Sequence, residues 1–350
     1  MMNRIALLYC TVVLTFGAGL LSTVGVLNAQ DAEPGLARVL ISPPYVADEY
    51  RSVREMFRDP DQWKRCREYA DGISLGGAQL NKSFSDDDLK NMFDGLKSMN
   101  MTFDLEVWAV KKFEPVGSKQ FRSHKKWFDR FIACGGKIHA IAIDEPLNGT
   151  EKVEQDLAYA VKETADFIEL VRKEYPEILI GDIEAYPHFD ADTLIDWIDA
   201  LQAELKKRKV RELDFFRLDI NWSIFGKEMK GRPLSRHPDA GPRTGSWEDV
   251  LRIERHCKSI GLPVSIIFWA ANHGTLKRVD LVDEKTWYLG VMRMGDDYFS
   301  HRSAGANQFV YQSWITVPSE ILPETKPYTF THSFLEFAGK FLKNKRSNRQ

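Results

Sequence analysis

The stretch CGGKIHAIAIDEP, residues 134–146, decides how the rest of the chain is interpreted. Gly135 and Gly136 are typical of the end of a helix, and the apolar run that starts at Ile138 is typical of a buried strand. The run ends in two acids and a proline. A helix end, a buried strand and a polar strand end therefore follow one another closely, as in a chain that alternates helices with parallel strands.

The same unit recurs along the chain. Strands are expected at residues 39–44, 73–77, 102–109, 138–145, 178–186, 213–222, 264–270 and 308–315, each followed by a segment of helical period. Ser85 and Asp88 form an expected capping box before one of these helices. Eight such units predict an α/β fold, a single (β/α)8 TIM barrel. An open doubly wound sheet is the alternative, but a glycine-rich turn does not follow the first strand.

The N-terminus resembles a targeting segment. Arg4 precedes a long apolar run, and Ala29 offers a small residue at a cleavage site. We therefore expect a signal peptide at 1–29 and a catalytic barrel at 30–345, with a secreted, extracellular or periplasmic location and no membrane span once the signal is removed. The alternative is an uncleaved membrane anchor.

The charge balance and the cysteines exclude some classes of partner and of covalent structure. Once Arg4 is removed with the expected signal peptide, the chain has 47 basic and 50 acidic residues, and this slightly acidic balance argues against nucleic acid as a partner. Cys66, Cys134 and Cys257 lie in helix-like segments without a disulfide framework, and we expect them to be buried small apolar residues.

Carboxylates gather at the expected strand ends, which form the functional face of such a barrel. Because side chains alternate along a strand, the sequence predicts that three polar sets point inward: Asp104, Glu106 and Trp108; Asp182 and Glu184; and Arg217, Asp219 and Asn221. Crowded carboxylates shift one another's pKa values, as general acids, bases and nucleophiles require. The alternative is a polar plug in which the acids pair with Arg217 and asparagines.

Aromatic residues accompany the acids at the strand ends. The set consists of Tyr45, Trp108, Tyr186, Trp222, Trp269 and Trp314. A flat ring with a polar edge can stack on the C–H face of a pyranose while nearby polar groups bind its hydroxyls. We therefore expect a carbohydrate substrate, although filling of the core would explain any single tryptophan.

Asp144-Glu145-Pro146 resembles the Asn-Glu-Pro motif at the end of strand four in the clan A retaining glycoside hydrolases of the (β/α)8-barrel superfamily. The resemblance implies a glycosidase in which Glu145 is the general acid/base and the proline fixes the turn that presents it. That clan places its nucleophile, a glutamate, at the end of strand seven. Residues 264–273 contain no acid, so the second carboxylate must come from elsewhere or the mechanism differs.

Three sources of the second group remain open. Glu184 on strand five or Asp219 on strand six could act as nucleophile or as water-activating base. Alternatively, Asp144 and Glu145 resemble the Asp-Glu pair of substrate-assisted N-acetylhexosaminidases, in which the Asp orients the substrate's 2-acetamido group. Glu145 is the acid in each version, and none requires a cofactor or a metal.

Two other functions remain possible. One is a carbohydrate-binding barrel that has lost catalysis. The other is a metal-assisted enzyme using His139, His188 or His273, although a histidine pair at metal-binding spacing is missing. Residues 223–245 form a long basic loop that either contacts an acidic or sulfated glycan or is solvated.

Overall fold

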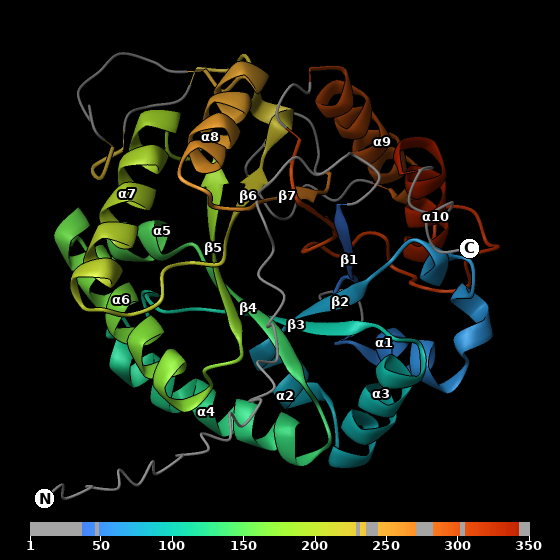
Figure 1. The fold of residues 1–350 in the computed structure, drawn as a ribbon. Helices are drawn as coiled ribbons and strands as arrows, with labels where there is room; N and C mark the ends of the chain where they lie inside the picture. The colour runs from blue at the N-terminus through green and yellow to red at the C-terminus, as the bar shows by residue number, and fades with distance from the viewer. Residues whose placement is uncertain are drawn as a thin grey trace, which may run out of the picture.

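Eight parallel strands close into a barrel in the computed structural model, which describes residues 37–45, 49–228, 232–235, 244–270, 283–301 and 305–342. Figure 1 shows the strands at the centre of the molecule and the helices arranged as a ring around them. The strands are β1 (Arg38–Ser42), β2 (Gly72–Gly76), β3 (Thr102–Val107), β4 (Ile138–Asp144), β5 (Leu179–Tyr186), β6 (Phe215–Ile220), β7 (Val264–Phe268) and β8 (Gln308–Gln312).

The barrel confirms the predicted fold and excludes the open sheet. β1 pairs with β8 as well as with β2, with Leu40 opposite Val310, so the sheet has no free edge. Seven of the strands end before the predicted boundary. The residues beyond those ends leave the hydrogen-bonded ladder and form the mouth of the barrel, which is where a barrel builds its functional face.

The helices surround the barrel as expected. They are α1 (Arg51–Arg58), α2 (Gly77–Ser83), α3 (Asp86–Ser98), α4 (Gly117–Ala133), α5 (Pro146–Glu151), α6 (Leu157–Glu174), α7 (Ala191–Lys207), α8 (Trp247–Ser259), α9 (Glu284–His301) and α10 (Phe330–Phe341), with short 3-10 turns η1 (Pro60–Trp63), η2 (Cys66–Glu68) and η3 (Trp222–Ile224). The capping box of Ser85 and Asp88 is present at the start of α3. The apolar period predicts Val153 on the same helix face as Leu157, but Val153 precedes α6, because Asp156 caps that helix by accepting from the Tyr159 N–H.

Two apolar layers hold the fold together. The larger one lies between strands and helices, and a smaller one fills the barrel interior with Leu40, Ala140, Ala142, Ile183, Phe215, Ile267, Trp269 and Val310. The interior is crowded: a Cβ added to Gly181 would lie 2.1 Å from the Phe215 ring. A bulky side chain on β6 is therefore matched by a glycine on β5.

Predictions outside the barrel have mixed outcomes. Cys66, Cys134 and Cys257 are buried free thiols, as expected. The expected signal peptide, 1–29, lies outside the described residues. Within those residues, none of the helices is both long and apolar enough to span a membrane.

Candidate active site

A cavity of about 720 Å³ opens at the carboxyl ends of the strands. The strand-end residues that line it include Glu106, Trp108, Asp144, Glu145, Asp219, Asn221, Trp269, Gln312 and Trp314. They come from five strands and the segments that follow them, β3, β4, β6, β7 and β8. The barrel therefore brings together, in one hollow, polar groups far apart in the sequence.

Four carboxylates face this cavity: Glu106, Asp144, Glu145 and Asp219. The Lys111 Nζ lies 2.6 Å from Asp144 Oδ2, so Asp144 is held as an ion pair. Glu145 Oε2 accepts from the Asn148 side-chain amide at 2.5 Å. Glu106 Oε2 accepts from the Gln312 side-chain amide at 3.2 Å.

The backbone of Glu145 is unusual. Its φ of 48° and ψ of 57° lie in the left-handed region, which costs free energy for a residue with a Cβ and is concentrated at functional sites. The turn is fixed by Pro146 at the first position of α5 and by the Glu145 N–H, which donates to the Ile183 carbonyl at 2.8 Å. The sequence expectation that a proline follows and fixes this turn agrees with the structure.

Burial and mutual repulsion raise the pKa values of three of these acids. Burial is the larger cause for each, and a neighbouring carboxylate adds to it: Asp144 for Glu106 and Glu145, and Glu145 for Asp219. The pKa of Glu106 rises to about 7, and that of Asp219 rises well above its ordinary value. Because Glu145 and Asp219 oppose each other's ionisation, the pair favours a state with one proton and one charge.

Asp182 and Glu184 do not point into the barrel, so the predicted orientation of β5 is wrong. Asp182 Oδ2 accepts from the Trp197 indole of α7 at 2.7 Å, and Glu184 Oε1 accepts from the Leu147 N–H of α5 at 2.8 Å. Ile183 and Ala185 line the cavity instead. The inward positions of β5 take small or apolar residues because Phe215 of β6 fills the interior beside Gly181.

Arg217 faces inward as predicted but is not a cavity-lining residue. Its guanidinium is fully buried and donates to Ser265 Oγ at 3.0 Å and to Gln308 Oε1 at 2.7 Å. Asp104 faces inward too, and it pairs with Arg38 at 2.7 Å. The polar plug weighed as an alternative therefore exists, but it consists of these residues and leaves the carboxylates at the mouth outside it.

Aromatic rings form part of the cavity wall. Tyr45, Trp108, Tyr186, Trp269 and Trp314 line it, and the Trp269 and Trp314 rings lie 4.6 Å apart. Trp222 is the exception, since it is buried and its indole donates to the Trp269 carbonyl at 3.4 Å. Its predicted contact with substrate has no support in this geometry, and it instead packs behind Trp269.

Helix α4 orients Trp108. The Trp108 indole donates to Gln120 Oε1 at 3.1 Å, and its backbone N–H donates to His124 Nε2 at 3.3 Å. Burial lowers the pKa of His124 to about 4, so the ring stays neutral and keeps this acceptor. The tryptophan is thereby held at the cavity edge at a fixed angle.

Several cavity residues escaped the sequence analysis. They include Tyr50, Gln79, Lys111, Asn148, Lys152 and Gln312. Gln312 ends β8 and could have been found by its polar character at a strand end. Lys111 and Lys152 lie in the segments after β3 and β4, where sequence alone does not indicate which residues turn back toward the barrel.

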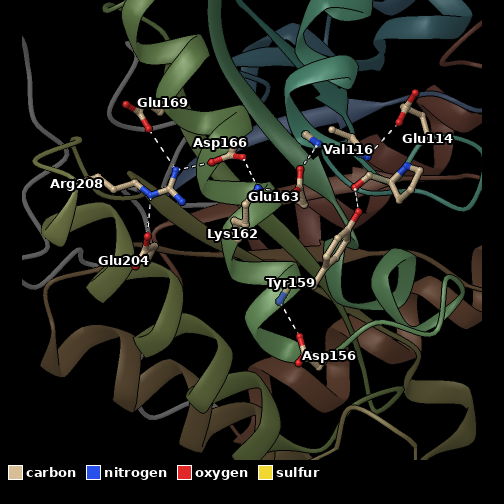
Figure 2. A network of polar contacts seen from close by, with 12 residues as sticks. Glu114, Val116, Asp156, Tyr159, Lys162, Glu163, Asp166, Glu169, Glu204 and Arg208 are labelled. Carbon is tan, nitrogen blue, oxygen red and sulfur yellow. Dashed lines mark hydrogen bonds and ion pairs between the residues drawn. The ribbon is translucent and has the colours of Figure 1, made fainter.

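A polar network on α6 anchors the segment that carries Lys111 (Figure 2). Glu163 Oε2 accepts from the Gly117 N–H at 2.9 Å, and the Tyr159 hydroxyl donates to the Pro115 carbonyl at 3.2 Å. Asp166, on the same helix, bonds Arg208 at 2.6 Å and so links α6 to the end of α7. The segment between β3 and α4 is therefore tied to the helical ring, which holds Lys111 toward Asp144.

The metal-assisted alternative finds no supporting geometry in the described part of the chain. None of its His, Cys, Asp and Glu residues form a group of three or more that could hold a metal ion. His273 lies outside the described residues. His188 lines the cavity, but its contacts are with Arg232 and Phe189.

Comparisons with known proteins give no family. No protein-family model matches the sequence, and no curated protein does. Matching solved structures include Rhizobium etli pyruvate carboxylase with the activator acetyl coenzyme-A (TM-score 0.47, 13% identity), of whose chain this protein spans 28%, with 96% of this chain covered. A second match is QR15, an aldolase, with a TM-score of 0.45 and 12% identity over 89% of this chain and 96% of that chain. A third is a psychrophilic glycoside hydrolase family 10 endo-β-1,4-xylanase, with a TM-score of 0.46 and 10% identity over 79% of this chain and 86% of that chain. The names of these three proteins give different activities.

Proposed function

We propose that this protein is a secreted glycoside hydrolase acting on a poly- or oligosaccharide, with Glu145 as the general acid/base and Asp219 as the second carboxylate. The observation that carries the proposal is that both acids face one aromatic-lined cavity, where burial and neighbouring carboxylates raise the pKa of each. Glycosidic bond cleavage requires one protonated and one ionised carboxyl that flank the scissile bond.

The surroundings give each group a role. Glu145 lies on a rigid turn, and its raised pKa allows it to hold a proton for the leaving oxygen. Asp219 faces the same cavity from β6 and can act as nucleophile or as base toward water. Trp269, Trp314 and Trp108 offer flat faces for sugar rings, and Asn221 and Gln312 offer amides for hydroxyls.

The substrate-assisted alternative is less well supported. It requires Asp144 to orient a 2-acetamido group, but Asp144 is engaged by Lys111 at 2.6 Å. The choice of Glu184 as second carboxylate is weaker still, because that side chain points to the first turn of α5. Asp219 is therefore the better partner for Glu145.

The test is a screen for reducing-sugar release on a broad polysaccharide and aryl-glycoside panel, with Glu145→Gln run beside the wild type. Removing a general acid should lower turnover of poor leaving groups by roughly 10²- to 10⁴-fold and that of dinitrophenyl glycosides much less. Wild-type kcat/KM should also fall as pH rises through the raised pKa of Glu145, because the proton donor is lost.

Other outcomes would contradict the proposal. If Glu145→Gln lowered turnover equally for good and poor leaving groups, Glu145 would not be the acid. If Asp219→Asn instead lowered turnover of poor leaving groups much more than that of dinitrophenyl glycosides, Asp219 would be the acid and the two roles would be exchanged. A wild-type protein that binds glycans on an array but releases no sugar from any member of the panel would favour the non-catalytic carbohydrate-binding barrel.

A further inference from the structure

One edge of the cavity carries hydrogen-bond donors that the proposed reaction does not use. His188 follows β5 and lines the cavity, and its Nδ1 lies 3.5 Å from the Arg232 guanidinium. Arginine only donates, so Nδ1 acts as the acceptor and the ring proton lies on Nε2. Burial and the charges of Arg232 and Lys152 lower the pKa of His188 to about 3, which keeps this tautomer neutral.

The donor that results has nothing to bond within the described part of the chain. His188 Nε2 is buried and lacks a hydrogen-bond partner there. Arg232 is itself held in place, since it pairs with Glu151 of α5 and its guanidinium lies 5.5 Å from the centre of the Phe189 ring. The imidazole is therefore fixed by a side chain whose own charge is already neutralised.

Lys152 supplies a positive charge on the same edge. It ends α5, where its backbone N–H donates to the Asn148 carbonyl at 3.2 Å, and its exposed side chain lines the cavity. Lys111 and Arg232 are paired with acids, whereas none of the ion pairs among the described residues includes Lys152. Its charge lowers the pKa values of both His188 and Glu145, so it lies near the imidazole and near the proposed acid.

We infer that His188 and Lys152 form a subsite for an anionic substituent, a carboxylate or a sulfate ester, on a sugar bound next to Glu145. An imidazole N–H and an ammonium group only donate, so they complement a group that only accepts. The inference deepens the proposed function and rests on it for the location of the sugar.

The acids of the cavity do not exclude an anion. Lys111 pairs with Asp144, and burial raises the pKa of Glu106 to about 7 and that of Asp219 above its ordinary value, so the cavity carries less negative charge than its four carboxyls would give if all were ionised. The charge of Lys152 is then not cancelled by the carboxylates around it. A negative group can approach this edge while the mixed protonation of the catalytic pair is kept.

The experiment measures binding by calorimetry, using the full chain with Glu145→Gln to prevent turnover. The probes are matched pairs: oligogalacturonate, oligoglucuronate and oligomannuronate, each with its carboxyl-reduced form, and chondroitin sulfate with its desulfated form. The anionic member of at least one pair should bind about tenfold tighter or more. Uronate pairs and the sulfate pair report separately on the two kinds of anion.

Second substitutions in the same background test the residues. Lys152→Met and His188→Leu should each remove most of the anion preference, and Lys152→Arg should keep it. Lys126→Met, an exposed lysine on the outer face of α4, changes the net charge equally and should leave the preference intact.

Equal binding within every pair, no binding of any anionic probe, or a preference that survives Lys152→Met would overturn the subsite. Failure of the glycosidase proposal has a different signature. If the wild type bound anionic glycans with the expected preference but never cleaved them, the glycosidase proposal would fail and the subsite would stand. If it cleaved neutral glycans and showed no preference for anions, the subsite would fail and the glycosidase proposal would stand.

Discussion

β5 and β6 lie side by side and both carry charged side chains at alternate positions, yet these side chains face opposite sides of the sheet. On β6, Asp219 points into the cavity, and Leu218 points to the helices. On β5, Ile183 and Ala185 take the inward positions, and the acids face outward. Register confirms the contrast, because Ala185 is opposite Asp219 and Glu184 is opposite Leu218.

The difference shows that alternation divides a strand into two faces without saying which face is inside. The Phe215 ring decides which face of β5 is inside, because it occupies the space that a Cβ at position 181 would need, and glycine has no Cβ. Each outward acid accepts one hydrogen bond, Asp182 from the Trp197 indole and Glu184 from the first turn of α5.

The largest test of the contrast compares one acid from each strand. Asp219→Asn should lower kcat by roughly 10²- to 10⁴-fold, because it removes a group that faces the reacting bond. Asp182→Asn, on the neighbouring strand, should leave kcat near the wild-type value. Steady-state kinetics on any substrate found in the screen checks both, with circular dichroism to show that both variants are folded. Similar losses in the two variants would contradict the assignment.

Asp182 should instead affect the free energy of unfolding and its dependence on pH. Burial raises its pKa from an ordinary 3.8 to about 7, so between these values the folded protein holds a proton that the unfolded chain has lost. The free energy of unfolding therefore falls as pH rises through that window.

Asp182→Asn, which mimics the protonated form, should be more stable than the wild type by roughly 2–4 kcal/mol near pH 8, and the gain should disappear near pH 4. Urea unfolding at both pH values measures it. Glu177→Gln, at an exposed carboxyl, controls for the loss of one charge. A gain that did not change with pH would refute this account.

Gly181 tests the packing that sets the orientation of β5. Gly181→Ala should destabilise the fold by about 1–3 kcal/mol, because the new methyl meets the Phe215 ring in a full interior. Phe215→Leu in the same chain should recover part of the loss. Gly339→Ala is the matched control: it lies in α10 with open space around it and should stabilise slightly, as helical Gly→Ala changes do. Additive effects of the changes at 181 and 215 would argue against direct contact.

Substitutions of Glu184 give the smallest expected effect on kcat, and they distinguish a structural role for this side chain from a catalytic one. Its side chain accepts from the Leu147 N–H just after the strained turn at Glu145, and burial raises its pKa well above the ordinary value. Glu184→Gln preserves the acceptor without a charge and should keep kcat near the wild-type value. Glu184→Ala should lower kcat by up to about tenfold and alter the basic limb of the pH profile, because the turn loses a hydrogen bond. Abolition of activity by Glu184→Gln would restore Glu184 as a nucleophile.

Much of the candidate site is within reach of the sequence. Strand ends in a barrel meet at one face, so Glu106, Glu145, Asp219 and the tryptophans that follow β3, β7 and β8 can be grouped from their positions along the chain. Lys111, Lys152 and His188 cannot, because they lie in segments after strands. Their direction depends on contacts with α5, α6 and Arg232 that local patterns do not encode.

Local sequence patterns specify the eight strand-helix units, the closed barrel they imply and the polar character of its mouth, because periodicity and helix signals are properties of short segments. Packing in three dimensions settles which acids enter the cavity, that Arg217 is part of the plug, and that Asp144 is paired with Lys111. Those outcomes depend on how side chains from different strands share a confined interior. The competition for volume between Gly181 and Phe215 exists only in the closed barrel, where β5 and β6 lie side by side.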